Sequence, residues 1–231
     1  MKKKLVVFSG AGISAESGLD TFRDNGGLWD DYDINDVATP EAWLKDPVMV
    51  LDFYNLRRRI ASKAKPNAAH IAIAKLEDIL DVTVITQNID SLHEKGGSTN
   101  VIHLHGEVNK VRSTGTNEVF QQGVDPLLFG DVCPSGHQLR PHVVWFGEQV
   151  PNFTIAQEII STADYLIVTG TSLNVYPAAG LIHAATENSL KFLVDPSGSI
   201  KISSIKNLTT HQEKATIGIP KVAQLIRNNI C

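Results

Sequence analysis

Glycines at a defined spacing are the first feature of this 231-residue chain that could do chemistry. Gly10, Gly12 and Ala15 follow the apolar run 4–9 with the spacing G-x-G-x-x-G/A. Such a turn lets backbone N–H groups approach a pyrophosphate, and a helix N-terminus then stabilises the negative charge. A glycine-rich turn after a strand can also be a plain tight connection, so the spacing alone is weak evidence.

Histidines give a second candidate site. His103 and His105 lie two residues apart in segment 100–108, on one face of a predicted strand. An imidazole titrates near neutral pH and can serve as a general base, although a single histidine in a strand is more often structural. His70 and His183 fall in predicted helices, and we interpret both as structural.

A tyrosine and an arginine form a third pair. Tyr54 and Arg57 are three residues apart in a predicted helix and therefore share one face. A guanidinium can bind a carboxylate with two hydrogen bonds, and a phenol can add another. A solvated basic surface is the alternative for any of these arginines, and we assign Arg58 and Arg59 to the surface.

Strands and helices must position these residues. The apolar and β-branched content predicts strands over 4–10, 81–90, 100–108, 140–148, 164–173 and 189–197, and helical spacing predicts helices over 67–80, 152–163, 176–188 and 220–230. Most strands are continuous apolar runs, which is typical of a parallel sheet covered on both faces. We therefore predict an α/β fold: a doubly wound, mostly parallel, Rossmann-like sheet. Ligands bind such sheets at the carboxyl ends of the strands.

Two regions interrupt this alternation and predict a small inserted module. The large part takes about 1–35, 67–106 and 142–231, and the small module about 36–66 and 107–141, within a single catalytic domain. We expect apolar contacts to hold the module together, and the candidates are Val119, Phe120, Leu127, Leu128 and Phe129.

Composition excludes several classes of protein. The chain is 42% hydrophobic and 20% charged, which predicts a globular fold, and its net charge of −4 gives no sign of nucleic-acid binding. No window is long enough to span a membrane, and two cysteines make no disulfide scaffold. We expect a cytoplasmic monomer with no nucleic-acid or membrane partner.

The turn differs from that of a dehydrogenase, in which a second strand would end in an acidic residue. The candidates Asp30, Asp31 and Asp33 lie in a segment that does not have the pattern of a buried strand. Five blocks instead occur in order: "GAGISAESGLDTFRDNGGLW", "TQNIDSLH", "HLHGE", "RPHVVWFGE" and "GTSLNVYPAAG". Together they resemble the sirtuin family of NAD-dependent protein lysine deacylases, from about residue 4 to 220. The resemblance is strongest to the bacterial branch that removes succinyl as well as acetyl groups.

This resemblance implies a site that cleaves NAD as a co-substrate. His105 matches the family's catalytic base, and Asn88 and Asp90 match the residues that surround the nicotinamide. Phe22 would shield the reacting face from water, while Arg23 and Gln87 would hold phosphate and ribose. The implied NAD-binding residues are Gly10, Ala11, Gly12, Ser14, Ala15, Phe22, Arg23, Trp29, Gln87, Asn88, Ile89, Asp90, Gly170, Thr171, Ser172, Asp195 and Ala215.

The resemblance also implies a binding site for an acyl-lysine peptide. Segment "VVWFGE" would supply an edge strand to which the peptide adds, with Val144, Phe146 and Gly147 in contact. Tyr54 and Arg57 match the pair that marks family members acting on succinyl, malonyl or glutaryl groups. Ala38 matches a small residue that leaves room for them.

The chain departs from the family at two places. Most sirtuins bind structural zinc through two CxxC pairs, but here only Cys133 remains, with His137 nearby, so we expect no metal. Leu193 stands where relatives usually have a ribose-contacting asparagine. Mono-ADP-ribosyl transfer and a non-catalytic NAD-sensing module are the alternatives to deacylation.

Overall fold

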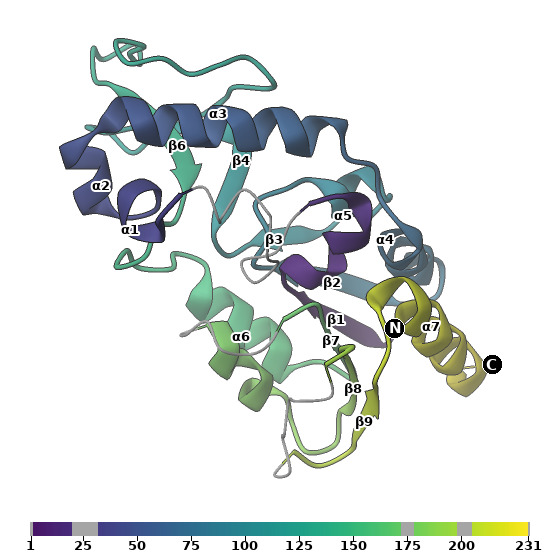
Figure 1. The fold of residues 1–231 in the computed structure, drawn as a ribbon. Helices are drawn as coiled ribbons and strands as arrows, with labels where there is room; N and C mark the ends of the chain where they lie inside the picture. The colour runs from purple at the N-terminus through teal and green to yellow at the C-terminus, as the bar shows by residue number, and fades with distance from the viewer. Residues whose placement is uncertain (1, 20–31, 172–177, 198–204, 231) are drawn as a thin grey trace.

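A parallel sheet of six strands forms the centre of the molecule. The computed structural model describes residues 2–19, 32–171, 178–197 and 205–230. The strand order is β3-β2-β1-β7-β8-β9, and every pair is parallel, so the predicted fold class is confirmed (Figure 1). The strands are β1 (Lys4–Ser9), β2 (Asp81–Thr86), β3 (Val101–His103), β7 (Tyr165–Thr169), β8 (Leu190–Val194) and β9 (Leu208–His211). Strand β9 was not predicted, because its short sequence is polar and partly exposed.

Helices cover both faces of this sheet. Alternate side chains of a strand point to opposite faces, so Leu5 and Val7 pack in one apolar cluster and Val6 and Phe8 in another. Figure 1 shows α4 and α7 beside each other on the first face and α6 on the second. Their bounds are α4 (Ala68–Ala74), α6 (Phe153–Ser161) and α7 (Ala215–Ile230). None of the helices in the described ranges is long and apolar enough to cross a bilayer.

A small antiparallel sheet lies apart from the large one, in the order β5-β4-β6. It consists of β4 (Gly106–Ser113), β5 (Val119–Gln121) and β6 (Leu139–Val143), and it packs with α1 (Ile34–Val37), α2 (Pro40–Lys45) and α3 (Pro47–Lys63). In Figure 1, α3 runs across β4 and β6. We predicted a strand over 140–148. The observed strand, β6, ends at Val143 and is an edge strand of this small sheet.

The strand predicted over 100–108 is two strands in two sheets. The chain leaves the parallel sheet at His103 and enters the small sheet at Gly106. Gly106 has a φ of +78°, and a Cβ on it would lie 2.1 Å from the His142 carbonyl oxygen. Only glycine fits this close approach, so the prediction of one continuous strand was wrong, and His105 lies at the bend.

Three further expectations need correction. The predicted helix over 176–188 is, in its described part, a 3-10 helix (Ala178–Ala184). The final helix begins at Ala215, not at residue 220, because its buried apolar stripe already begins there. In the small module Leu127 is buried and Phe120 packs nearby, but the other three proposed core residues are exposed: Val119, Leu128 and Phe129.

Candidate active site

The glycine turn after β1 is fixed against the end of β7. The N–H of Gly10 donates to Thr169 O (3.1 Å), and that of Gly12 donates to Gly170 O (2.8 Å). A Cβ on Gly12 would lie 2.8 Å from Gly170 Cα, so the two backbones can approach only because neither residue has a side chain. Ala11 and Ala15 then begin two short 3-10 turns, η1 (Ala11–Ile13) and η2 (Ala15–Ser17).

Gly170 carries the tightest constraint of this turn, which gives a prediction. Its φ is +63°, and a Cβ would lie 2.2 Å from Ile13 N. Gly170→Ala should therefore lower the free energy of unfolding by about 3 kcal/mol, from strain and displaced backbone. Chemical denaturation measures the loss, with Gly180→Ala as the control because its Cβ would meet nothing within 4 Å. Equal stability of the two variants would contradict the prediction.

The loop after β2 is joined to the glycine turn through buried polar groups. Asn88 Nδ2 donates to Ser14 Oγ (3.1 Å), and Ser14 Oγ donates to Asp90 Oδ2 (3.1 Å). The N–H of Leu92 donates to the other oxygen of Asp90 (3.0 Å). Burial raises the pKa of Asp90, although these two hydrogen bonds oppose the rise. Ser14, Asn88 and Asp90, three of the residues expected to bind NAD, are thus joined by hydrogen bonds.

Among the described residues, Nδ1 of His105 has a hydrogen-bond partner and Nε2 has none. Its Nδ1 lies 3.0 Å from the carbonyl oxygen of Gln87. A carbonyl can only accept, so Nδ1 carries the proton and the lone pair of the neutral ring is on Nε2. Burial lowers the pKa of His105, although the bond to Gln87 opposes this, so the neutral form dominates at pH 7. His105 is only half-buried, and its Nε2 can act as a base.

His103, the other candidate base, has acceptors at both ring nitrogens. Nδ1 lies 2.8 Å from the carbonyl oxygen of Asn88, and Nε2 lies 2.8 Å from Glu94 Oε1. Burial alone would lower the pKa of His103, but the bond to Glu94 and its charge outweigh burial and raise it. A ring that donates from both nitrogens is an imidazolium and has no lone pair for catalysis. Geometry therefore favours His105 as the base and gives His103 the role of holding the loop.

A buried polar chain beneath the loop was missed by sequence reasoning. Ser9 Oγ donates to Thr86 Oγ1 (2.9 Å), which also accepts the N–H of Asn88 (3.1 Å). His93, in α5 (Leu92–Lys95), lies 2.9 Å from Ser9 Oγ through Nε2. The position of His93 in the "TQNIDSLH" block was the available signal. These hydrogen bonds tie the loop after β2 to the end of β1.

Backbone hydrogen bonds connect His105 to the candidate peptide-binding edge. The N–H of Val144 donates to His105 O (2.9 Å), and the N–H of Phe146 donates to Ala38 O (3.0 Å). Phe146 and Gly147 are exposed, whereas Ala38 is buried. Segment 144–147 thus joins the histidine to the turn between α1 and α2, although it does not continue β6 as a strand.

Tyr54 and Arg57 both lie on α3, close enough for the charge of Arg57 to act on the Tyr54 hydroxyl. Tyr54 is buried in a cluster with Ala38, and Arg57 is half-buried. Arg58 is also buried: it donates from Nε to Val108 O (2.8 Å) and from an amino group to Asn55 Oδ1 (2.6 Å). Our assignment of Arg58 to the surface was wrong, because this guanidinium joins α3 to β4. Arg59 is exposed as expected.

Asp195 and Ala215 were predicted to bind the adenosine end of NAD. Asp195 directly follows β8, and its Oδ1 accepts the N–H of Ser197 (2.9 Å), whereas Ala215 is buried at the start of α7. Leu193 is 1% exposed and packs in the core on one face of the sheet. The expectation that Leu193 occupies a ribose-contacting position does not hold, because its side chain is inside the core; Asp195 is the residue at the carboxyl edge.

The residues present fit a dinucleotide. The observation that supports this fit is Gln87 Nε2, a buried donor with no partner among the described residues. Such a donor needs an acceptor, which a ribose hydroxyl or a phosphate oxygen would supply. Ile89 is held in place by the Val108 N–H, which donates to its carbonyl (2.8 Å), and Thr171 is buried next to the turn. Four predicted residues lie outside the described ranges: Phe22, Arg23, Trp29 and Ser172.

Cys133 takes part in a hydrogen bond. Its Sγ lies 3.3 Å from Ser113 Oγ, which also accepts the N–H of Thr116 (3.1 Å). The N–H of Cys133 donates to His137 O (2.8 Å). Across the described ranges no group of three or more histidine, cysteine, aspartate or glutamate residues is placed to hold a metal ion.

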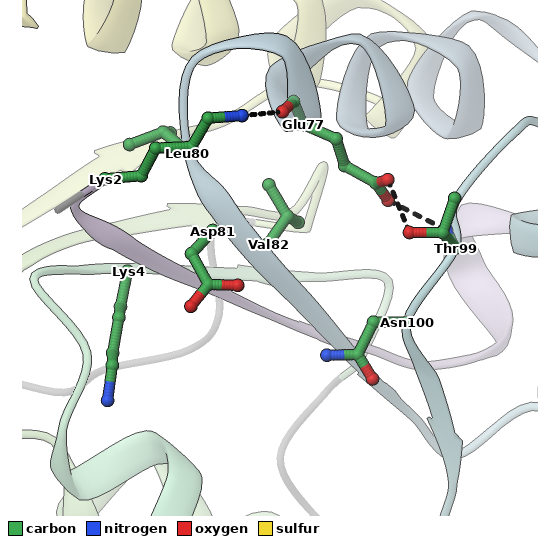
Figure 2. Close-up of a pocket in the computed structure, with 8 residues that line it drawn as sticks. All are labelled: Lys2, Lys4, Glu77, Leu80, Asp81, Val82, Thr99 and Asn100. Atoms are coloured by element: carbon green, nitrogen blue, oxygen red, sulfur yellow. Dashed lines mark hydrogen bonds between the residues drawn. The ribbon is translucent and has the colours of Figure 1, made fainter.

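A hollow of about 460 Å³ lies away from all of these residues (Figure 2). It is at the opposite edge of the sheet, where β1 and β2 begin. Glu77 there accepts from Lys2 Nζ (2.7 Å) through its backbone carbonyl and from the hydroxyl of Thr99 (2.7 Å) through its carboxylate. The glycine turn, the loop after β2 and His105 all lie at the carboxyl edge instead, so we place the functional site there.

A glycine turn, a polar loop and a histidine base at the carboxyl edge of a Rossmann-like sheet define a nucleotide-binding α/β protein. The model of the Sir2 family matches residues 10–177. The chain belongs to this family.

Individual relatives agree with that assignment. The chain is 44% identical over 230 residues to an NAD-dependent protein deacylase of Bacteroides thetaiotaomicron, covering 97% of this chain and 98% of the relative. It is 50% identical over 194 residues to one of Helicobacter pylori, covering 84% and 83%. A solved Sir2 homologue–NAD complex has a TM-score of 0.87 at 38% identity, covering 100% of this chain and 91% of that one.

Proposed function

We propose that this protein removes acyl groups from protein lysine side chains by cleaving NAD, releasing nicotinamide and O-acyl-ADP-ribose. The observation that carries the proposal is His105: its Nδ1 is bound to Gln87 O in the loop that continues to Asn88 and Asp90, and its Nε2 has no partner among the described residues. The relatives named NAD-dependent protein deacylase support it. Loss of nicotinamide makes the anomeric ribose carbon of NAD an electrophile, which the acyl oxygen of the substrate attacks. One water is then consumed as the bond between the acyl carbon and the lysine nitrogen breaks, so lysine leaves with a free amine and the acyl group stays on the ribose.

The chain's own residues have distinct roles in this scheme. His105 takes a proton from a ribose hydroxyl through Nε2 and is held by the Gln87 carbonyl. Asn88 and Asp90 offer a polar, acidic surface for the cationic nicotinamide. The acyl-lysine peptide lies along segment 144–147, whose backbone already contacts His105 and Ala38. Phe22 and Arg23 remain proposed NAD contacts.

We further propose that succinyl groups, and also malonyl and glutaryl groups, are accepted besides acetyl. Arg57 would bind the terminal carboxylate with the help of Tyr54, and the methyl side chain of Ala38 leaves room beside them. The support is that Tyr54 and Arg57 lie about one turn apart near the middle of α3, and that Tyr54 and Ala38 share one cluster.

Mass spectrometry of matched acetyl-lysine and succinyl-lysine peptides, with and without NAD, tests the proposal. We expect NAD-dependent loss of both groups, with one nicotinamide and one acyl-ADP-ribose formed per acyl group removed. Loss of acetyl alone would contradict the acidic-acyl part. If neither peptide changes, deacylation is wrong, and ADP-ribose found on the protein fraction would favour mono-ADP-ribosyl transfer.

We also propose that structural zinc is absent, which gives a prediction. A tetrahedral site needs four nitrogen or sulfur ligands, whereas Cys133 is paired with a serine hydroxyl here. Deacylation after exhaustive treatment with EDTA should stay within about twofold of the untreated rate, because no metal stabilises the fold. A zinc-finger protein treated in parallel shows that chelation is complete. One zinc per chain by elemental analysis would contradict the prediction.

The division into a large NAD-binding part and a small module stays a prediction. So do the monomeric state and the cytoplasmic location.

A further inference from the structure

The hydroxyl group of Tyr54 has a fixed direction. Trp145 Nε1 lies 3.1 Å from the Tyr54 oxygen, and both side chains are buried, at 2% and 3% exposed. An indole nitrogen can only donate, so the Tyr54 oxygen accepts and its own proton must point elsewhere. Burial raises the pKa of Tyr54 to about 12, even against the opposing charge of Arg57, so the hydroxyl keeps its proton.

That proton has no acceptor in the described part of the chain. Trp145 is the partner that the Tyr54 hydroxyl has there, and Trp145 offers no lone pair. A buried hydroxyl donor without an acceptor is costly, by about 1–3 kcal/mol. The charge of Arg57 acts on the same hydroxyl. An acceptor placed between a phenol donor and a guanidinium is best supplied by an anion, and a carboxylate has the geometry for both.

Trp145 is itself held rigidly. The Arg140 guanidinium carbon lies 3.2 Å from the centre of the indole ring. The backbone N–H of Trp145 donates to Glu148 Oε2 (2.8 Å). Glu148 also accepts from Arg140 (2.7 Å) and from Arg112 (2.8 Å), so it is anchored on two sides. The indole therefore cannot rotate its N–H away from Tyr54 without breaking this arrangement.

We propose that Trp145 is a specificity-determining residue: by donating to the Tyr54 oxygen, it directs the Tyr54 hydroxyl proton toward the terminal carboxylate of an acidic acyl group bound beside Arg57. This inference rests on the acidic-acyl part of the proposed function. Without the indole N–H, the Tyr54 hydroxyl is free to rotate and loses its preorganisation for the substrate. An acetyl group has no such carboxylate, so its removal does not depend on Trp145 in this way.

Trp145→Phe tests the inference, because it keeps an aromatic ring and removes the donor. We expect kcat/KM for a succinyl-lysine peptide to fall about tenfold, mostly through KM, while that for the acetyl peptide stays within twofold; the size corresponds to one hydrogen bond. Trp43→Phe is the matched control. The ring centres of Trp43 and Trp145 are 5.8 Å apart, and the hydrogen bond to the Tyr54 oxygen comes from Trp145. This control should change neither substrate.

A double-mutant cycle separates the inference from a general packing role. In a Tyr54→Phe background, which has no hydroxyl to orient, Trp145→Phe should have no further effect on the succinyl peptide. A tenfold loss that persists there, or an equal loss of both activities from Trp145→Phe alone, would overturn the inference. If Trp145→Phe does not fold, replacement of Trp145 by benzothienylalanine, with sulfur in place of the N–H, is the second variant and should give the same result.

Failure of the proposed acidic-acyl activity can be told apart from failure of the role proposed for Trp145. If the unaltered protein removes acetyl but not succinyl groups, the acidic-acyl proposal fails, and this inference with it. If the unaltered protein removes succinyl groups and Trp145→Phe removes them equally well, only the role of Trp145 is overturned.

Discussion

His105→Ala is expected to lower kcat/KM for both acetyl and succinyl peptides by about 10³-fold. A positioned general base contributes roughly 10²–10⁴-fold to a proton-transfer step. The Nδ1 proton of His105 is donated to the Gln87 carbonyl, so its lone pair is on Nε2, which has no partner among the described residues. Steady-state kinetics with nicotinamide release as the readout measures the loss. His183→Asn is the control, since His183 is exposed on a 3-10 helix.

The dependence on pH has a defined sign. Burial lowers the pKa of His105 below its ordinary value of 6.5, so the neutral base is lost only as the pH falls through that lower value. We expect kcat/KM to be flat from pH 7 to 8 and to fall on the acid side below 6.5. The acid limb belongs to His105 if it disappears in His105→Ala and persists in His183→Asn. A loss of less than tenfold in His105→Ala would contradict the assignment of the base.

Arg57→Met is expected to lower kcat/KM for the succinyl peptide by about 100-fold and to leave the acetyl peptide unchanged or improved. Removing the cation leaves the substrate carboxylate buried without its charged partner, which costs about 2–5 kcal/mol. Methionine keeps the length of the apolar stem, so the packing of α3 is disturbed little. Competition between the two peptides in one reaction, followed by mass spectrometry, measures the ratio directly.

Two neighbouring arginines make the controls. Arg59→Met removes an exposed charge from the same helix and should change neither activity. Arg58→Met should instead destabilise the protein, since the Arg58 guanidinium holds the carbonyl of Val108 and the side chain of Asn55. Equal loss of acetyl and succinyl activity in Arg57→Met, with stability retained, would contradict an acyl-binding role for Arg57.

The sequence by itself determined the sheet, the glycine turn and the residues that gather at its edge. Short, β-branched apolar runs such as 165–169 are typical of strands in a sheet covered on both faces, and the glycines at 10 and 12 permit an approach that no side chain allows. Parallel strands end at one edge, so polar residues that follow them were expected at that edge, where Ser14, Asn88 and Asp90 are hydrogen-bonded to one another. These are consequences of local pattern and topology.

Only the tertiary structure decided the hydrogen-bond partners and the burial of each side chain. His103 and His105 have the same chemistry in sequence, but the bend at Gly106 sends the chain into another sheet and gives them different partners. Arg58 is buried rather than exposed because a carbonyl of β4 lies over it.

Trp145 and Tyr54 are 91 residues apart, and only packing brings the donor to the acceptor. Local sequence fixes which groups are available. The protonation state, the hydrogen-bond direction and the burial of these side chains depend on partners distant in the sequence. Only the folded structure brings those partners into contact.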